Sequence, residues 1–495
     1  MSGDREIELK FACGPDDLAA VLAAAPKSVP GGDDETRELI SVYFDTPDLA
    51  LQKAGASLRV REHKGKRTQT LKRGQGMIRE EHEAPIEGLA PDPALEPLPK
   101  LLPDGATLKP AFNVRVSRRQ RTLRYQDAEI ELALDQGEVT GGDRKSDICE
   151  VELELKSGPP ETLFALAREL LDAAPLYVAF DSKAARGQAL VDEGRPDRKP
   201  GHKGGEIALS DEITVGQAFQ TIARQALAQI ALNATALRQR PNAHAVHQLR
   251  VGARRLRSTL STFKPLLEGP GLDILNNELR WLGGACNMAR TLDVFAAETL
   301  HPAETGERPP LALHSLRKGI DAARRKAWAE AAEAAASLRF RVLMLDAVAW
   351  LETGDWLDGP DAGAPIVPFA QHALKRHLKK LAKRGRAARG GDDEARHHLR
   401  IAAKKLRYAT EAFASLCGER RAGRYVEHIR DLQDELGALN DLAVAEPLIG
   451  TLKLTPEAAY AAGELVGLKA AERPHMIARA EKALDRLEAA RPPWR

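Results

Sequence analysis

Glu6-Ile7-Glu8-Leu9-Lys10 decides the fold of the first half of this 495-residue chain, and Glu150-Val151-Glu152-Leu153-Glu154 repeats its pattern. Side chains of an extended strand alternate between two faces, so the charged residues of each stretch share one face and the apolar residues share the other. Several further segments show the same alternation with charges of both signs. This repetition predicts an antiparallel sheet that closes into a tunnel lined with charge.

The predicted lining contains both cations and carboxylates. Strand alternation groups its members as Arg59 with Arg61; Lys72; Arg79 with Glu81 and Glu83; Arg115 with Ser117, Arg119 and Arg121; Glu129 with Glu131, Ala133 and Asp135; and Glu150 with Glu152 and Glu154. Buried charges cost on the order of several kcal/mol each unless they are paired. A half-exposed sheet with cross-strand Glu–Arg pairs, worth under about 1 kcal/mol each, explains any one strand. A tunnel that holds a ligand explains all of them together.

A polyphosphate with a divalent metal satisfies both signs of this lining. Arg and Lys donate charge-assisted hydrogen bonds to phosphate oxygens, and carboxylates are the hard oxygen ligands that Mg2+ or Mn2+ prefers. The sequence contains neither a GxxxxGK[ST] phosphate loop nor a Ser/His/Asp or Cys/His spacing that indicates a covalent nucleophile. The pattern therefore favours metal-assisted phosphoryl transfer, in which a metal bridges phosphoryl oxygens and a second metal or a carboxylate orients water.

Composition bounds the rest of the chain. Its length allows two or three domains, and its formal net charge of +2 says little about partners because the charges are locally segregated. The four cysteines, Cys13, Cys149, Cys286 and Cys417, lie far apart without a CxxC pair. This spacing predicts buried thiols in a reducing cytoplasm rather than a zinc knuckle or a disulfide framework. Neither an N-terminal signal nor a membrane-spanning stretch is predicted.

The composition changes near residue 200. Before it lie short alternating segments with helical interludes at residues 15–25 and 159–173, and after it the chain is rich in Ala, Leu, Arg, Lys and Glu with helical spacing. We expect a tunnel domain over residues 1–193, a Gly- and Pro-rich linker over 194–209 and an all-helical domain over 210–495. The expected fold class is α+β.

The helical half contains an internal duplication. His247–Arg257 aligns without gaps to His397–Arg407, and the same offset relates Phe263 to Phe413 and Phe219 to Phe369. The two copies extend over about residues 210–360 and 361–495. They predict a pseudo-symmetric helical bundle.

Each copy carries a cationic helical stripe next to an apolar one. The stripes consist of His247, Arg250, Arg254 and Arg257, and of His397, Arg400, Lys404 and Arg407; a further basic run includes Lys375, Arg376, Lys379 and Lys383. One such helix is usually only solvated, but two in the same register favour a shared anion-binding groove. Aromatic residues are too sparse for base stacking, so nucleic acid is not expected and a bare phosphate polymer is. If the histidines lie in the groove, binding should tighten as pH falls through about 6.5, and added salt should weaken it.

Two family resemblances follow from these residues. Glu6-x-Glu8-x-Lys10, Tyr43-Phe44-Asp45-Thr46, Leu58–Arg61, Glu150-x-Glu152-x-Glu154 and Ser182–Gly187 together resemble the CYTH domain of the triphosphate tunnel metalloenzymes. The duplicated His-led helices are similar to the CHAD domain. The resemblances imply an eight-stranded antiparallel tunnel that cleaves linear triphosphates with Mg2+ or Mn2+, followed by a helical module that binds polyphosphate.

The resemblance also assigns residues to the tunnel site. The metal ligands that it implies are Glu6, Glu8, Asp135, Glu150, Glu152 and Glu154. The phosphate-binding residues that it implies are Lys10, Arg59, Arg61, Lys72, Arg119, Lys183 and Arg186. Strand alternation adds Glu81 to the catalytic set and Arg79, Arg115 and Arg121 to the residues that would bind substrate. Only alternation favours Arg119 over Arg118, and three glutamates compete on the last acidic strand.

The function expected is that of a cytoplasmic, metal-dependent inorganic triphosphatase with a polyphosphate-binding helical domain, associated with polyphosphate granules. Its partners would be inorganic triphosphate and inorganic polyphosphate, without nucleic acid or membrane. One alternative is a phosphohydrolase or cyclase acting on thiamine triphosphate or ATP, and another is a non-catalytic granule-binding protein. The preferred metal, the substrate chain length, the oligomeric state and the coupling between the domains stay open.

Overall fold

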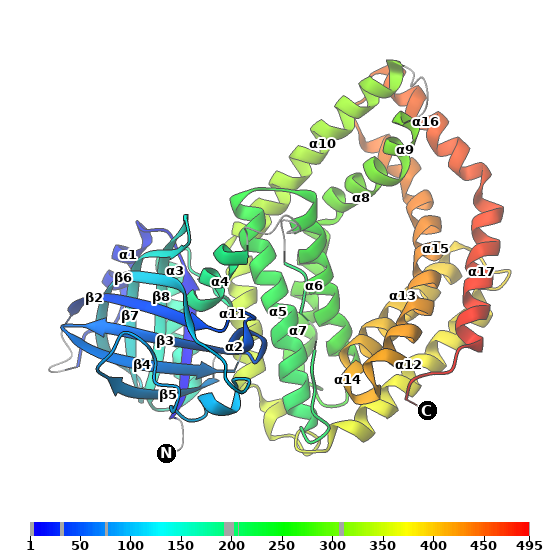
Figure 1. Cartoon of the computed structure of the whole chain (residues 1–495). Helices are drawn as coiled ribbons and strands as arrows, with labels where there is room; N and C mark the ends of the chain where they lie inside the picture. The colour runs from blue at the N-terminus through cyan, green and yellow to red at the C-terminus, as the bar shows by residue number, and fades with distance from the viewer. Residues whose placement is uncertain are drawn as a thin grey trace. The chain divides into compact units, whose positions relative to one another are not determined.

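The alternating segments of the first half form strands, and the second half forms helices (Figure 1). This computed structural model describes residues 4–29, 34–74, 78–192, 202–205, 207–305 and 311–494. The side chains of residues 4–6, 78, 79, 192 and 311 lie outside the described part. The chain divides into two units, Met1–Pro200 with Leu338–Ala349, and Gly201–Ser337 with Trp350–Arg495. Residues 194–201 and 206 of the predicted linker lie outside the described residues.

The first unit is an antiparallel sheet that closes on itself. Its strands are β1 (Asp4–Ala12), β2 (Glu35–Asp45), β3 (Ala56–His63), β4 (Lys66–Arg73), β5 (Ile78–Ile86), β6 (Lys109–Tyr125), β7 (Ala128–Gly141), β8 (Arg144–Ser157) and β9 (Tyr177–Val178). They follow the order β5-β4-β3-β2-β6-β7-β8-β1-β9, and β5 also pairs with β1, which closes the ring. The predicted fold class is confirmed, except that the sheet has nine strands rather than eight because the short β9 adds to β1.

Helices cover part of the outer face of this sheet. The two predicted helical interludes are confirmed as α1 (Asp17–Ala24) and α3 (Pro160–Ala173), and α2 (Ala50–Lys53) follows β2. Helix α3 buries Leu163, Leu166 and Leu170, and it packs against β7 and β8, whose outward Leu132 and Leu153 are also buried. Burial of apolar side chains on this face leaves the opposite, inward face for polar groups.

The inward face is not polar along its whole length. An apolar cluster fills one segment of it and includes Tyr43 of β2 and Phe112 of β6, whose rings stack with centroids 4.7 Å apart. Helix α4 (Lys183–Asp192) lies against this cluster at Gly187, where a Cβ atom would be 2.1 Å from Phe112 Cδ2. Glycine is therefore required there, and it brings the first turn of α4, with Lys183, up to the charged segment of the interior.

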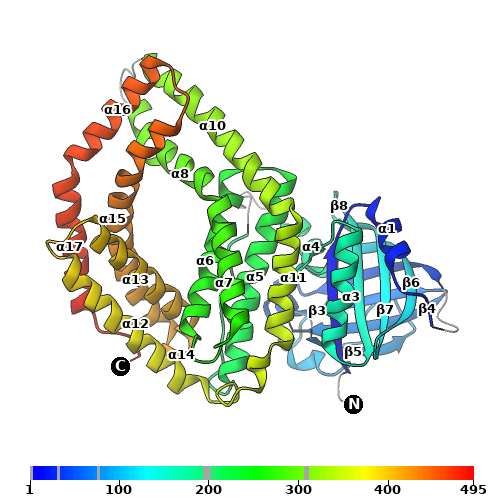
Figure 2. The ribbon, with the colours of Figure 1, turned by 180° about the vertical axis from the view of Figure 1, so that it is seen from behind.

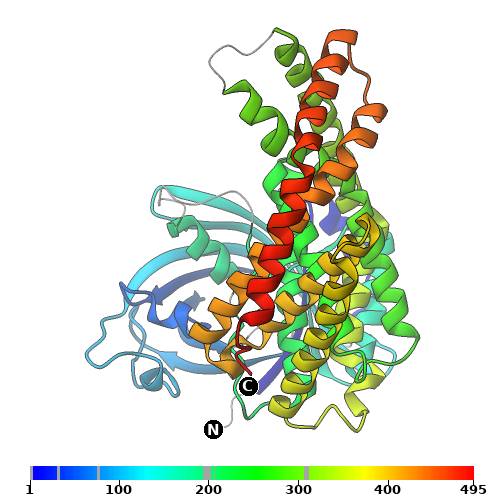
Figure 3. The same cartoon turned by 90° about the vertical axis from the view of Figure 1, so that its right-hand side faces the viewer.

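The second unit is helical throughout. Its helices are α5 (Val215–Gln239), α6 (Ala243–Thr262), α7 (Pro270–Ala285), α8 (Asn287–Phe295), α9 (His301–Glu304), α10 (Leu311–Ala336), the remainder of α11 (Leu338–Thr353), α12 (Ile366–Ala388), α13 (Asp393–Ala412), α14 (Ala414–Cys417), α15 (Glu419–Thr451), α16 (Pro456–Ala471) and α17 (Arg473–Ala489). Within this unit, α5 and α6 pack as one hairpin and α12 and α13 as another (Figure 2), and α17 runs along α15 (Figure 3). No helix in the described ranges has the length and hydropathy needed to cross a membrane.

The duplication is visible in the centre of this unit. Helices α6 and α13 begin at equivalent N-caps, where the side chains of Asn242 and Asp392 accept hydrogen bonds from backbone amides. Phe263 packs against three phenylalanines at ring distances of 5.4, 4.8 and 6.0 Å, namely Phe219, Phe369 and Phe413. The four rings are the two pairs that the duplication relates, so the aromatic core joins the repeats and aligns α6 with α13.

Candidate functional site

Lys183 lies among three buried carboxylates of the closed sheet. Its Nζ is 2.8 Å from Asp135 Oδ2, 2.6 Å from Glu150 Oε2 and 2.8 Å from Glu152 Oε1. Burial alone would lower the pKa of Lys183, but Glu152, Asp135 and Glu150 raise it well above its usual range. The helix α4 thus supplies a fixed positive charge to the acidic strands β7 and β8.

Arg118, Lys10 and Arg186 complete this network. Arg118 donates from Nε and Nη2 to the two oxygens of Asp135, at 2.7 Å each, and it also pairs with Glu152. Lys10 Nζ lies 2.9 Å from Glu152 Oε1 and 3.2 Å from Glu8 Oε2. Arg186 Nη2 lies 2.7 Å from Glu150 Oε1.

Asp135 and Glu152 favour their ionised forms despite their burial. Burial raises the pKa of Glu152, but Lys10, Lys183 and Arg118 outweigh it and hold that pKa well below its usual range. The pKa of Asp135 is likewise lowered, against burial, by Lys183 and Arg118. The carboxylates of β7 and β8 thus lie in the interior in close ion pairs with these cations.

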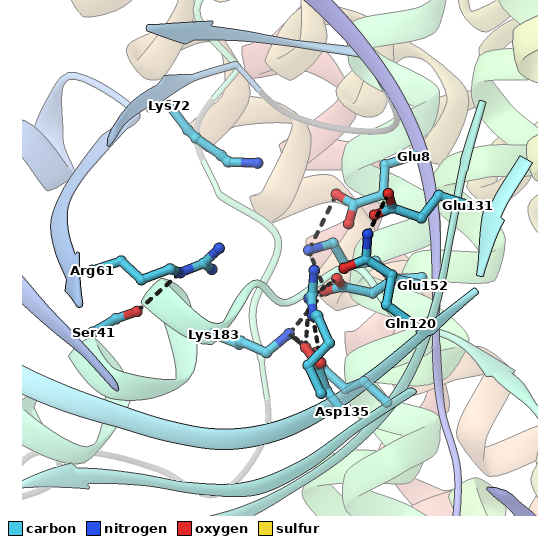
Figure 4. Close-up of polar contacts among 12 residues, drawn as sticks. Glu8, Ser41, Arg61, Lys72, Gln120, Glu131, Asp135, Glu152 and Lys183 are labelled. Atoms are coloured by element: carbon cyan, nitrogen blue, oxygen red, sulfur yellow. Dashed lines mark hydrogen bonds and ion pairs between the residues drawn. The ribbon is translucent and has the colours of Figure 1, made fainter. Parts of the chain in front are cut away.

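A second wall of the interior is cationic. On β3, β4 and β5, Lys72 Nζ lies 3.0 Å from Glu81 Oε2 and Arg59 Nη2 lies 3.9 Å from Glu81 Oε1. Figure 4 shows Lys72 and Arg61 extending into the interior toward the side that carries Glu8, Glu152 and Asp135. One wall thus offers donors for phosphate oxygens, and the other offers carboxylate ligands for a metal together with the cations that pair with them.

Arg61 is the least neutralised of the inward cations. Its Nε lies 3.4 Å from Ser41 Oγ, and no carboxylate ion pair to it is found among the described residues. Burial, followed by the charges of Arg59 and Arg118, lowers the pKa of Arg61 to about 10. An anion that enters the interior would offset this burial and repulsion and would stabilise the charged guanidinium of Arg61.

The acidic group has the donors that a divalent cation needs. One ligand oxygen each from Asp135, Glu150 and Glu152 lies within 4.8 Å of the others, and all three residues are buried. Such hard oxygens suit Mg2+ or Mn2+. Lys183 contacts one oxygen of each of these three carboxylates, so a bound cation would either displace its ammonium group or bind beside it.

The predicted phase of β6 is wrong. Arg119 and Arg121 lie on the opposite face from Arg118 and pair with Asp34, with Arg121 Nη2 2.9 Å from Oδ2, and Arg115 is exposed. We expected these arginines inside because the charged face of each strand was expected to line the tunnel. The inward residues of β6 are instead Phe112, Val114, Val116, Arg118 and Gln120, which begin in the apolar cluster and become polar only from residue 118.

Other predicted tunnel residues have mixed outcomes. Glu154 is half-buried, lies 2.7 Å from Lys156 Nζ and stands opposite Glu8 in the β1–β8 register. The Cα atoms of Glu6 and Arg79 pair across β1 and β5, but their side chains lie outside the described residues. Sequence reasoning missed Arg118 as an interior residue, together with Gln120, which donates to Glu131 Oε2 at 2.6 Å.

The helical unit contains a cavity of about 750 Å³ between the two repeats. Its lining includes the carboxylates Glu298, Asp434 and Asp441 and basic residues from both repeats, namely His247, Arg250, Arg254, Arg290, His397, Arg400, Lys404 and Arg407. Arg254 Nε also donates to Tyr408 Oη at 2.7 Å, which links α6 to α13. Most of the residues of the two predicted stripes therefore line one pocket.

The cations of this cavity repel one another. Burial and the neighbouring Arg400, Arg254 and Arg407 lower the pKa of Lys404 to about 6. Burial, Arg290 and Arg254 lower the pKa of His247 to about 4. His247 therefore gains its charge at a lower pH than the expected value of about 6.5. Burial likewise lowers the pKa of Arg250 to about 10. An anion would relieve this repulsion.

Several predicted anion-binding residues lie away from the cavity. Arg257 Nε donates to Asn276 Oδ1 at 3.0 Å, and Arg376 Nη2 donates to Thr262 O at 2.7 Å. Lys375, Lys379 and Lys383 of α12 are exposed and do not line the cavity. Sequence reasoning missed Arg290, although it lies in the segment that follows the first copy and faces the cavity from α8.

Comparison with known proteins supports this division of the chain. Residues 4–187 match the CYTH domain and residues 221–450 match the CHAD domain. The chain is 32% identical over 199 residues to a Haemophilus influenzae protein named inorganic triphosphatase, covering 38% of this chain and 55% of that protein. The alignment thus spans about half of that relative.

Two further similarities extend over more than half of the chain. An uncharacterized Mycobacterium tuberculosis protein is 26% identical over 419 residues, which is 76% of each chain. The crystal structure of the CHAD domain from the plant Ricinus communis aligns with a TM-score of 0.52 and 29% identity, covering 59% of this chain and 97% of that one.

Proposed function

We propose a function for each half of this chain, which carries a CYTH domain followed by a CHAD domain. The closed sheet would hydrolyse inorganic triphosphate with a divalent cation, and the helical domain would bind inorganic polyphosphate. One observation supports hydrolysis in the closed sheet. An acidic wall, in which Asp135, Glu150 and Glu152 surround Lys183, faces a cationic wall across the interior. The named relative from Haemophilus supports the reaction class.

The cationic wall would bind the triphosphate. Arg61, Arg59 and Lys72 would donate to phosphate oxygens, and Arg61 has most to gain because it has the weakest neutralisation of the three. Arg118 would bridge from the acidic side. Glu81, the carboxylate of the cationic wall, would orient a water molecule against the terminal phosphorus and accept its proton.

The acidic wall would hold Mg2+ or Mn2+. The ligands would come from Glu8, Asp135, Glu150 and Glu152, and a cation bound there supplies neutralisation of the phosphoryl oxygens as the P–O bond breaks. Lys183, Lys10 and Arg186 are positioning residues in this proposal, because they hold the carboxylate oxygens in fixed places.

The helical domain would gather the polymer. Its cavity carries crowded cations from both repeats, and burial together with their mutual repulsion lowers the pKa of Lys404 to about 6, which is the electrostatic state that a polyanion relieves. Polyphosphate carries regularly spaced negative charge and has no bases. It therefore does not need the aromatic stacking partners that nucleic acid uses and that are sparse in this chain. Such binding would bring the protein to polyphosphate granules in the cytoplasm.

Phosphate release from a substrate panel tests this proposal. The full chain is incubated with inorganic triphosphate, ATP, thiamine triphosphate or long-chain polyphosphate, each with Mg2+ or Mn2+. We expect the highest kcat/KM with inorganic triphosphate. Preference for thiamine triphosphate or ATP would replace the substrate, and no release from any of them with retained polyphosphate binding would leave a binding protein instead.

A further inference from the structure

We propose that Cys13 and Cys149 form a dithiol site that hydrogen peroxide converts reversibly to a disulfide. Their Sγ atoms lie 3.6 Å apart, although the residues are 136 positions apart in the chain. The sequence spacing had predicted unpaired buried thiols. The closed sheet brings these two cysteines together because β1 ends next to β8.

Backbone geometry makes the two residues direct neighbours across the sheet. The register that pairs Ala12 with Glu150 continues to Cys13 and Cys149, and the Cys13 amide donates to the Cys149 carbonyl at 3.2 Å. A disulfide has an S–S distance of about 2.05 Å, so the sulfurs need to approach by about 1.5 Å. Rotation about the two Cα–Cβ bonds supplies such a movement without a change of register.

Exposure separates this pair from the other cysteines. Cys13 and Cys149 are half-buried, whereas Cys286 and Cys417 are buried. By strand alternation, Cys149 faces outward with Val151, and Glu150 between them faces the interior. Peroxide can therefore reach the pair from the outer face, independently of any ligand in the interior.

The oxidation balances with peroxide as the only added reactant. One thiolate of the pair attacks an oxygen of hydrogen peroxide, the O–O bond breaks, and the hydroxide that leaves takes up a proton as water. The sulfenic acid formed is then attacked by the second sulfur, its S–O bond breaks, and a second water leaves with the proton of that thiol. Two thiols and one peroxide give one disulfide and two waters.

The product would stabilise the first unit. A bond between residues 136 positions apart removes much of the conformational freedom of the unfolded chain. The Cα atoms of a hydrogen-bonded antiparallel pair lie about 5.5 Å apart, which is within the range that a disulfide spans. The oxidised protein should therefore unfold at a higher temperature, and a dithiol reductant should reverse the effect.

The test uses the full chain, reduced and then treated with hydrogen peroxide. We expect the intact mass to fall by about 2 Da, a Cys13–Cys149 peptide in the digest and a higher first unfolding transition in calorimetry, all reversed by dithiothreitol. The Cys286→Ser, Cys417→Ser double variant should behave in the same way. Cys13→Ser and Cys149→Ser should each lose both the cross-link and the thermal shift.

Other products would overturn the proposal. These are a cross-link that involves Cys286 or Cys417, a disulfide between two chains, and sulfinic acid at Cys13 or Cys149 without a cross-link. Equal alkylation of Cys13 and Cys149 before and after peroxide would overturn it as well. None of these readouts depends on triphosphate hydrolysis, so failure here leaves the proposed function untouched.

Discussion

Arg118 holds Asp135 by two parallel hydrogen bonds inside the closed sheet, with Nε 2.7 Å from Oδ1 and Nη2 2.7 Å from Oδ2. The next residue, Arg119, lies on the other face and pairs with Asp34. Two adjacent arginines thus have opposite environments, one within the acidic network and one at the surface. They form a matched pair for mutation.

Replacing Arg118 should abolish most activity, and replacing Arg119 should not. Arg118→Ala removes a charged donor from the proposed phosphate site, for which losses of about 100-fold or more in kcat are typical. Arg119→Ala breaks a surface ion pair worth under about 1 kcal/mol. Steady-state hydrolysis of inorganic triphosphate measures both, with circular dichroism to establish that each variant is folded. Equal effects of the two substitutions would contradict the interior assignment of Arg118.

The same comparison exists within α6. Arg254 lines the cavity of the helical unit, whereas Arg257 donates to Asn276 outside it. We expect Arg254→Ala to weaken polyphosphate binding by about 10-fold or more. It should also reduce the slope of log Kd against the logarithm of the salt concentration by about the contribution of one phosphate contact. Arg257→Ala should change neither. Fluorescence anisotropy of labelled polyphosphate at several salt concentrations tests this, and a larger loss with Arg257→Ala would place the binding surface elsewhere.

Polyphosphate binding should take up a proton at Lys404. The free cavity lowers the pKa of Lys404 from 10.5 to about 6, mainly through burial and then through Arg400, Arg254 and Arg407. A bound polyanion favours the ammonium form of Lys404 and raises this pKa. Between the pKa of the free protein and the raised pKa, the complex therefore holds more protons than the free protein. The affinity for polyphosphate falls as the pH rises through this range.

Calorimetry in two buffers of different ionisation enthalpy measures this uptake near pH 8. Lys404→Met should abolish it and leave a weaker, less pH-dependent Kd. Lys405→Met is the matched control, because Lys405 bonds to Ser261 and does not line the cavity. Absence of proton uptake in the unmodified protein would show that Lys404 stays outside the bound polyanion's field.

Gly187 should be essential to the placement of α4. A Cβ atom at this position would lie 2.1 Å from the ring of Phe112, so Gly187→Ala should displace the helix that carries Lys183 and Arg186. We expect a lower first unfolding transition and a large loss of triphosphate hydrolysis. In α7, Gly283→Ala meets nothing within 4 Å and should be neutral or stabilising by up to about 1 kcal/mol. A Gly187→Ala variant with normal stability and activity would contradict the close packing.

Strand alternation predicted the tunnel because most of its strands have one apolar and one charged face. Lys10, Arg59, Arg61 and Lys72 lie inside as that pattern predicts. It failed on β6, where the inward face begins in the apolar cluster and the exposed outer face carries arginines. Charge alone does not mark the interior of this sheet, because an exposed outer face carries charged side chains as well.

Helical periodicity predicted the two cationic stripes, but it could not say which other cations share the cavity. The duplication places Arg254 and Lys404 in equivalent positions, and both line it. Arg290 enters from a helix that is only loosely repeated, and the basic run of α12 lies elsewhere. The contact of Cys13 with Cys149 depends on the β1–β8 register, which no local pattern reveals.

Metal-dependent cleavage of inorganic triphosphate tests the central claim most directly. Phosphate release is measured with Mg2+ or Mn2+, after chelation and after metal is restored, for the unmodified chain, for a folded Glu8→Gln, Glu152→Gln variant and for Arg119→Ala. We expect release that disappears on chelation, returns with metal and is lost in the glutamate variant while Arg119→Ala retains it. Release that persists in the glutamate variant, or that needs no metal, would contradict hydrolysis at the acidic wall of the tunnel.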